Sequence, residues 1–109
     1  NEIRNFGAVN TSATEMRVTV DYTYSGDHGT GNIFMSAYAR QSNSSQVPGT
    51  GYVVPAASVI AGSGSATVII KMDSGSGTYT STIVRVCMFI EGGSPFYCRE
   101  FAYTKSWTK

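Results

Sequence analysis

The two cysteines of this sequence are the residues most able to form a defined chemical site. Cys87 and Cys98 lie on either side of a Gly-Gly pair in the segment RVCMFIEGGSPFYCRE. A structural zinc site uses four ligands, and the chain has one histidine, which argues against a metal centre. A redox dithiol is usually a Cys-x-x-Cys motif, and these cysteines are much farther apart. We therefore expect a disulfide, with free buried thiols as the alternative, and an oxidised pair would indicate an oxidising compartment.

The glycines between the cysteines predict a hairpin and its register. If this Gly-Gly pair forms a two-residue turn, Cys87 faces Cys98 across two antiparallel strands. The same register aligns an opposite-charge pair and an aromatic pair on the cysteine face: Arg85 with Glu100, and Phe89 with Phe96. A four-residue loop would give the same pairs, but Pro95 lacks the N–H for its closing pair, which favours the shorter turn. The other face should be core, with the charged head of Arg99 reaching the sheet edge.

The remaining reactive side chains do not form a catalytic pattern. The only histidine, His28, lies in the glycine-rich segment SGDHGTG, and no nucleophile-elbow motif accompanies it. The acids are scattered singly, so no pair is placed for glycosidase chemistry. Asp27 and Asp73 lie in glycine-rich loops, but a calcium site needs about six oxygen ligands. We expect a protein that is not an enzyme and holds no metal or cofactor, and we leave open whether a loop binds calcium.

Length and composition indicate one domain, residues 1 to 109, of a secreted or surface type. The chain has the usual size of a single domain. Charged residues make up 14% of it and the net charge is +1, which disfavours nucleic acid as a partner. No apolar run approaches the roughly 20 residues that span a bilayer, so no membrane insertion is expected. The polar residues are mostly Ser, Thr, Gly and Asn, and the chain begins without Met; we expect a module of a larger protein, extracellular, at the cell surface or periplasmic.

Alternating apolar and polar residues predict an all-β fold. Period-two patterns, separated by turns rich in Gly, Ser and Asn, give about seven short strands. They are expected at Glu2 to Ala8, Glu15 to Tyr24, Asn32 to Arg40, Tyr52 to Ile60, Ala66 to Met72, Thr82 to Ile90 and Pro95 to Trp107. This number of strands in a chain of this length predicts a two-sheet antiparallel β-sandwich with a disulfide-stapled C-terminal hairpin.

One segment resembles a known fold family. The run GTYTSTIVRV, Gly77 to Val86, is similar to the E–F corner and F strand of fibronectin type III and immunoglobulin-like domains. The resemblance implies that Tyr79 is the corner tyrosine, with its hydroxyl bonded to nearby backbone. An antibody-type domain would also join its B and F strands by a disulfide packed on a tryptophan, whereas here both cysteines fall late and Trp107 lies in the last strand. The resemblance therefore implies sandwich architecture and no particular function.

Aromatic residues give the main functional signal. In the strand Asn32 to Arg40, the small and aliphatic residues can be buried so that Phe34 and Tyr38 face solvent, or the reverse, and the two arrangements are evenly matched. If the aromatic side chains face outward, this strand and the cysteine hairpin share a candidate binding face: Phe34, Tyr38, Arg40, Phe89 and Phe96. An apolar patch with a charged rim usually marks a contact surface.

The expected function follows from that face. Stacking of sugar rings makes a carbohydrate-binding accessory module the leading hypothesis. The alternative is a structural or assembly domain whose aromatic face packs on a neighbouring domain or subunit. A second candidate site is the loop end formed by Asp27, His28 and Glu91, which the sandwich topology should bring together.

Overall fold

A computed structural model describes all residues, 1–109, as eight strands without a helix. The strands are β1 (Glu2–Ser12), β2 (Glu15–Tyr24), β3 (Ile33–Arg40), β4 (Thr50–Tyr52), β5 (Ala57–Ser58), β6 (Gly62–Met72), β7 (Thr78–Ile90) and β8 (Pro95–Thr108). They form two four-stranded antiparallel sheets, in the orders β1-β2-β6-β4 and β5-β3-β7-β8. The predicted all-β, two-sheet antiparallel sandwich is confirmed, with eight strands instead of about seven.

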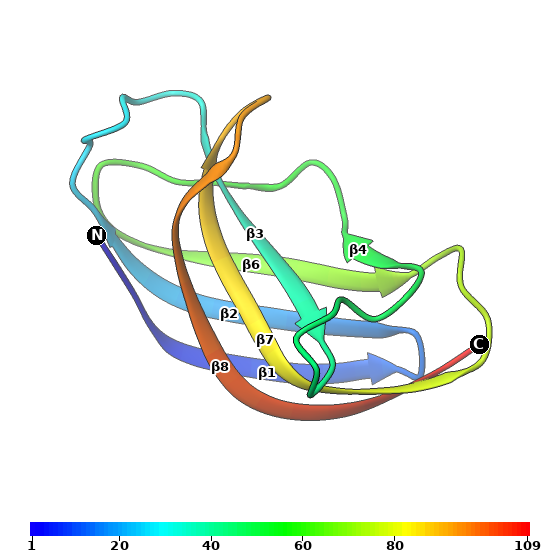
Figure 1. Cartoon of the computed structure of the whole chain (residues 1–109). Coiled ribbons are helices and arrows are strands. Elements are labelled where there is room, and N and C mark those ends of the chain that lie inside the picture. Colours follow the sequence, from blue (N-terminus) through cyan, green and yellow to red (C-terminus); the bar gives the residue numbers. More distant parts are fainter.

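The two sheets are the two layers of the sandwich (Figure 1). β1, β2 and β6 run side by side in one layer, and β3, β7 and β8 cross them in the other. β7 and β8 bend together, and the register shift between Ser81 and Ile83 is a bulge of the kind that bends paired strands. The end of β8 thereby reaches the β1–β2 turn, where the Thr108 N–H donates to the Ala13 carbonyl (3.2 Å).

The alternation in the sequence decides which face of each strand is buried. β2 shows it most clearly, because every even-numbered residue from Met16 to Tyr24 is buried between the sheets. Three more strands contribute buried residues in the same alternating way. They are β6 (Ala66, Val68, Ile70 and Met72), β3 (Ile33, Met35, Ala37 and Ala39) and β7 (Val84, Val86 and Met88). Residues of the opposite parity on β3 and β7 therefore lie on the outer face of the second sheet.

The predicted strand Tyr52 to Ile60 is wrong as a single element. β4 pairs with β6 in the first sheet. The chain then crosses to the second sheet, where β5 pairs with β3. Pro55 lies in the crossover and has no N–H to offer a ladder, which is one reason that pairing is interrupted there. The crossover leaves an apolar segment on the surface, with the Val54 side chain among the most exposed hydrophobic groups of the chain.

The cysteine hairpin has the predicted disulfide but a different turn. Cys87 and Cys98 are joined, with their Cα atoms 4.1 Å apart, a spacing typical of a non-hydrogen-bonded antiparallel pair. The predicted Gly-Gly two-residue turn is wrong: the strands are linked by four residues, and the Gly93 N–H donates to the Ile90 carbonyl (2.8 Å). Gly92 occupies the turn position with φ +74°, a conformation that favours glycine. Arg85 lies opposite Glu100 as predicted, although no ion pair joins them.

The predicted pairing of Phe89 with Phe96 is also wrong. The register shifts between Met88 and Phe89, so that Phe89 lies opposite Pro95. Because the side-chain period of a strand is two, a shift of one residue sends the next side chain to the other face. Phe96 accordingly packs against the core, with its ring 5.9 Å from that of the buried Tyr24.

The long last strand closes the side of the sandwich where it meets β1. As predicted for the core face, the head of Arg99 reaches the sheet edge, and its Nη1 donates to the Ile3 carbonyl (2.7 Å). The Nζ of Lys105, a buried residue, likewise donates to the Ser12 carbonyl (2.7 Å). The expected tyrosine corner is not formed, because the Tyr79 residue pairs with Trp107 in the ladder and its hydroxyl makes no hydrogen bond.

Candidate functional site

The outer face of β3 and β7 carries the predicted aromatic side chains. Phe34 and Tyr38 point away from the core and are half-buried, which decides between the two arrangements of this strand. Phe34 lies directly opposite Phe89, with ring centroids 5.9 Å apart and planes tilted by 36°. Tyr38 lies opposite Arg85. The structure thus brings three of the predicted aromatic side chains onto one face.

Tyr52 joins this group and was missed from the sequence. It lies on β4, in the other sheet, yet its ring is 5.7 Å from that of Tyr38 and 5.9 Å from that of Phe89. The ring therefore spans the row between them, which holds Ser36 and Cys87, and both of these outer-face residues are fully buried. Burial, and to a lesser degree the neighbouring Tyr38, raises the pKa of Tyr52. Nothing in the alternation predicts this contact, because it depends on the crossover between sheets.

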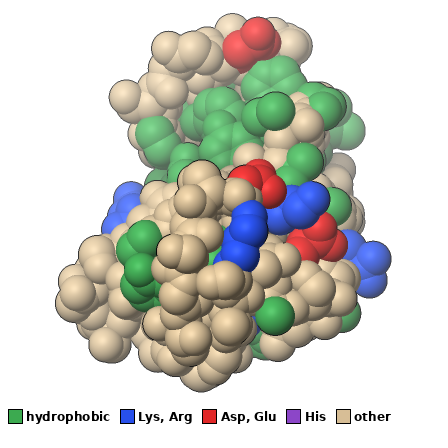
Figure 2. Space-filling model, turned by 90° about the vertical axis from the view of Figure 1, so that its right-hand side faces the viewer, with side chains coloured by type: hydrophobic (Ala, Val, Ile, Leu, Met, Phe, Trp, Pro, Cys, Tyr) green, Lys and Arg blue, Asp and Glu red, His purple; other side chains and the backbone are tan.

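The aromatic rings border a shallow groove of about 260 Å³. Its walls are three aromatic rings, three apolar residues of the crossover and one acid: Phe34, Tyr52, Phe89, Val54, Pro55, Ala56 and Glu91. Figure 2 looks onto the side of the molecule that carries β4, and shows hydrophobic side chains gathered there beside a row of basic and acidic ones. This groove is the larger of the two hollows of the chain, and two residues of the predicted binding face, Phe34 and Phe89, border it.

Glu91 is held at the groove by the hairpin turn. It directly follows β7, its N–H donates to the Asn32 carbonyl (2.9 Å), and the Gly92 conformation allows the chain to reverse immediately after it. Its carboxylate forms no hydrogen bond or ion pair with any side chain of the protein. The groove therefore has one charged group, and that group has no partner within the chain.

The predicted basic residue of the face lies at its far end. The Nη1 of Arg40 donates to the Ser44 carbonyl in the following loop (2.9 Å), while its Nε is buried without a partner. The Ser36 hydroxyl is the other buried polar group that lacks a partner. Arg40 thus belongs to the same face as the aromatic side chains but is not part of the groove wall.

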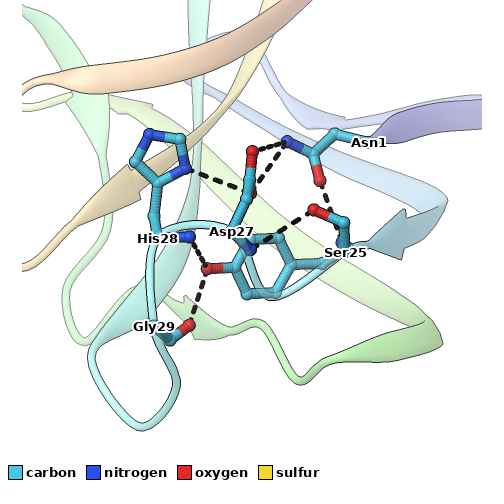
Figure 3. Close-up of polar contacts among 6 residues, drawn as sticks. Asn1, Ser25, Asp27, His28 and Gly29 are labelled. Carbon is cyan, nitrogen blue, oxygen red and sulfur yellow. Dashed lines mark hydrogen bonds and ion pairs between the residues drawn. The ribbon is translucent and has the colours of Figure 1, made fainter.

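The second predicted site, the loop end, is only partly assembled. Figure 3 shows Asp27 between His28 and Asn1: the His28 Nδ1 lies 3.1 Å from the Asp27 carboxylate, and the Asn1 amide donates to the same group (3.3 Å). The hydrogen bond from His28 is the main cause that lowers the pKa of Asp27. Asn1 also accepts a hydrogen bond from the Ser25 N–H (2.9 Å), so the start of β1 is tied to this loop.

Phe96 belongs to this loop end instead of the outer face. Its ring is stacked on the His28 imidazole, with centroids 3.9 Å apart and planes 19° apart. Glu91, in contrast, makes no contact of this kind with Asp27 or His28 and borders the aromatic groove. The arrangement ties the loop down, and no group of three His, Cys, Asp or Glu side chains could hold a metal ion.

A second, smaller hollow of about 130 Å³ lies on the other side of the crossover. It shares Val54 and Pro55 with the aromatic groove and is otherwise bordered by Val53 of the crossover and by residues of β5 and β6. The Val54 side chain, 74% exposed, therefore forms a ridge between two hollows. The available signal in the sequence was the run YVVPAA, where a proline inside an apolar strand pattern indicates that pairing is interrupted.

Comparisons with known proteins give no match to a family, to a curated protein or to a solved structure. The structure contains no helix that could span a membrane.

Proposed function

We propose that the domain is a non-catalytic binding module whose ligand occupies the aromatic groove, with carbohydrate as the leading ligand class. The observation that supports this proposal is the presence of three aromatic rings and one unpaired carboxylate around a single hollow. Ligand sites are mostly apolar concave surfaces with a few polar groups that fix orientation. A pyranose ring meets both requirements, because its C–H face packs on aromatic rings while its hydroxyls donate to a carboxylate.

The size of the groove suits a small part of a longer ligand. Pockets for whole drug-sized molecules are usually about 300–1,000 Å³, and this groove is about 260 Å³. One sugar unit of an oligosaccharide would fill it while its neighbours pass over the ridge at Val54 or along the charged row. An accessory module of a secreted or surface protein would use such a site to hold a larger protein on a glycan.

The architecture supports placing the domain among immunoglobulin-like and fibronectin-like sandwiches. In those folds the strand orders are ABED in one sheet and CFG in the other. The orders β1-β2-β6-β4 and β3-β7-β8 can be matched to them, while β5 at the edge of the second sheet, reached after β4, is a departure. In such modules, extracellular, surface or periplasmic location is common, and the disulfide suits an oxidising compartment.

A glycan panel with one variant and one matched control tests the proposal. Phe89→Ala removes an aromatic wall of the groove and should abolish retention on whichever polysaccharides hold the wild type. Tyr103→Ala is the control, because it removes an aromatic ring that packs near Phe6 outside the groove. Circular dichroism confirms folding of both variants. A wild type that no glycan retains, or a Phe89→Ala variant retained as well as Tyr103→Ala, would contradict the proposal.

The Val54 ridge favours a second candidate, an assembly domain. An apolar side chain 74% exposed between two hollows is a feature that association with another domain or subunit would bury. This candidate predicts a mass that rises with concentration in light scattering and returns to the monomer value in Val54→Asp. A strict monomer at high concentration would exclude self-association of this chain.

A further inference from the structure

We infer that the groove selects sugars with a free, positively charged amine, so that its ligand is an amino-sugar oligosaccharide and not a neutral or acidic one. The inference rests on the proposed binding function and names the ligand class of the same groove. Three features of the groove carry it: its charge, the electrostatics of its aromatic walls, and the distance to the nearest cations.

The charge of the groove is negative and has no internal counterpart. Glu91 is the only ionisable acid or base on the walls apart from the tyrosine hydroxyl, and no lysine or arginine borders the hollow. Its carboxylate is bound by no side chain of the protein. An ammonium group on a ligand would therefore be the first partner that this carboxylate has.

The aromatic walls favour the same charge. The faces of phenylalanine and tyrosine rings carry negative electrostatic potential and attract cations within about 6 Å of the ring centre. The ring planes are inclined to one another, by 36° for Phe34 and Phe89 and by 50° for Tyr52 and Phe89, so the rings that line the groove do not form a flat platform. A compact cation on the edge of a sugar ring can approach several ring faces in such a hollow, whereas an acidic sugar would be repelled by both the rings and Glu91.

The cations of this face lie outside the groove walls. The backbone of Arg85 is four residues from that of Phe89 along β7, roughly 13 Å at the rise of a strand. Arg40 lies one further pair along β3, and its guanidinium donates to the Ser44 carbonyl. The walls of the groove therefore contribute only the charge of Glu91 and the potential of the rings.

Two oligosaccharides that differ only in their amines test this inference. The probes are glucosamine oligomers and N-acetylglucosamine oligomers of equal length and linkage, titrated by calorimetry at about pH 6. The free amines should bind about ten-fold more tightly, the sum of one ion pair and the cation–aromatic contacts. The preference should shrink as salt is raised.

The variants separate a specific site from general attraction between charges. Glu91→Gln keeps the shape of the groove and should weaken binding of the glucosamine oligomer about five-fold without changing that of the acetylated one. Glu100→Gln removes a carboxylate from the same sheet face outside the groove and should change neither. Thermal unfolding checks that both variants are as stable as the wild type.

Each outcome decides the inference. Equal or tighter binding of the acetylated oligomer overturns it and leaves the carbohydrate proposal standing. A preference for amines that is undiminished in Glu91→Gln, or that Glu100→Gln reduces equally, also overturns it, because the preference would then not depend on the carboxylate of the groove. If neither these oligomers nor a neutral and acidic glycan panel binds, the proposed function fails together with the inference.

Discussion

Two sides of this sandwich combine aromatic rings with charged groups, and they differ in whether the charges are satisfied within the chain. Where β1 meets β8, the rings of Phe6 and Phe101 stack 4.7 Å apart, and the Arg99 guanidinium lies over Phe101 while donating to the Ile3 carbonyl. At the crossover from β4 to β5, the rings of Phe34, Tyr52 and Phe89 line a groove together with Glu91, whose carboxylate has no side-chain partner.

This difference in charge pairing indicates that the β1–β8 side is a structural cluster and the crossover side a candidate binding site, although both consist of aromatic and charged side chains. On the β1–β8 side, charged side chains replace missing strand pairing: β1 and β8 are edge strands of different sheets, and the Arg99 and Lys105 side chains of β8 donate to carbonyls of β1. On the crossover side, the rings and the carboxylate are arranged around empty space. Removing groups from the first side should therefore cost stability, and removing them from the second should cost binding.

The largest contrast is expected between two half-buried phenylalanines. Phe101→Ala removes the ring that stacks on Phe6 and supports Arg99, and should lower the free energy of unfolding by about 2–3 kcal/mol without affecting ligand binding. Phe89→Ala should cost about 1 kcal/mol, because this ring faces the groove instead of the core, and should abolish binding. Urea unfolding and ligand titration of both variants measure the two effects. Equal losses of stability with equal retention of binding would remove the distinction between the sides.

The charged groups should show the same contrast at smaller size. Arg99→Gln leaves the Ile3 carbonyl without its charged donor and should cost about 1–2 kcal/mol. Glu91→Gln should change stability by less than about 0.5 kcal/mol, since Glu91 is exposed and unpaired. Unfolding curves of the wild type and both variants at low and high salt sharpen the comparison. At high salt, only Arg99→Gln should still be less stable than the wild type. A Glu91→Gln variant as unstable as Arg99→Gln would mean that Glu91 has a structural role.

Two buried serines extend the comparison to neutral groups. The Ser81 hydroxyl accepts a hydrogen bond from the Trp107 indole (2.9 Å), whereas the Ser36 hydroxyl, beneath the Tyr52 ring, has no partner. Ser81→Ala should therefore lower the free energy of unfolding by about 1–2 kcal/mol, and Ser36→Ala should raise it by up to about 1 kcal/mol. Opposite signs in the same denaturation assay are the expected result. A destabilising Ser36→Ala would show that its hydroxyl is satisfied in solution.

Much of the fold could be predicted because each strand is read from local alternation. The strand from Glu15 to Tyr24 has the predicted bounds, and the cysteine register from Ile83 to Met88 is also as predicted. The failures involve contacts that alternation does not encode. One extra residue beside Pro95 moved Phe96 to the other face, and a change of sheet split the strand around Pro55.

The candidate site was predictable only in part for the same reason. Phe34, Tyr38 and Phe89 belong to two paired strands, and their common outer face was one of two evenly matched arrangements that the sequence allowed. Tyr52 comes from the opposite sheet, and its position over Ser36 depends on where the crossover passes. Glu91 was predicted at the loop end beside Asp27 and His28, but it borders the groove. Its position depends on the conformation of the hairpin turn, which the Gly-Gly pair alone does not specify.

The smallest expected effect is a pH dependence at the β1–β8 side. Burial lowers the pKa of Lys105 in the folded state below the value of about 10.4 that an unfolded chain provides. Between these two pKa values the unfolded state binds more protons, so the stability contributed by this residue increases as pH rises through that interval. Urea unfolding from about pH 7 to pH 10 should show the wild type gaining stability relative to Lys105→Met, with the exposed Lys71→Met as a control whose difference from the wild type stays flat. A flat Lys105→Met difference, or one that falls as pH rises, would show that the ammonium group is fully compensated by the Ser12 carbonyl and Trp107, and that this side has no unsatisfied charge at all.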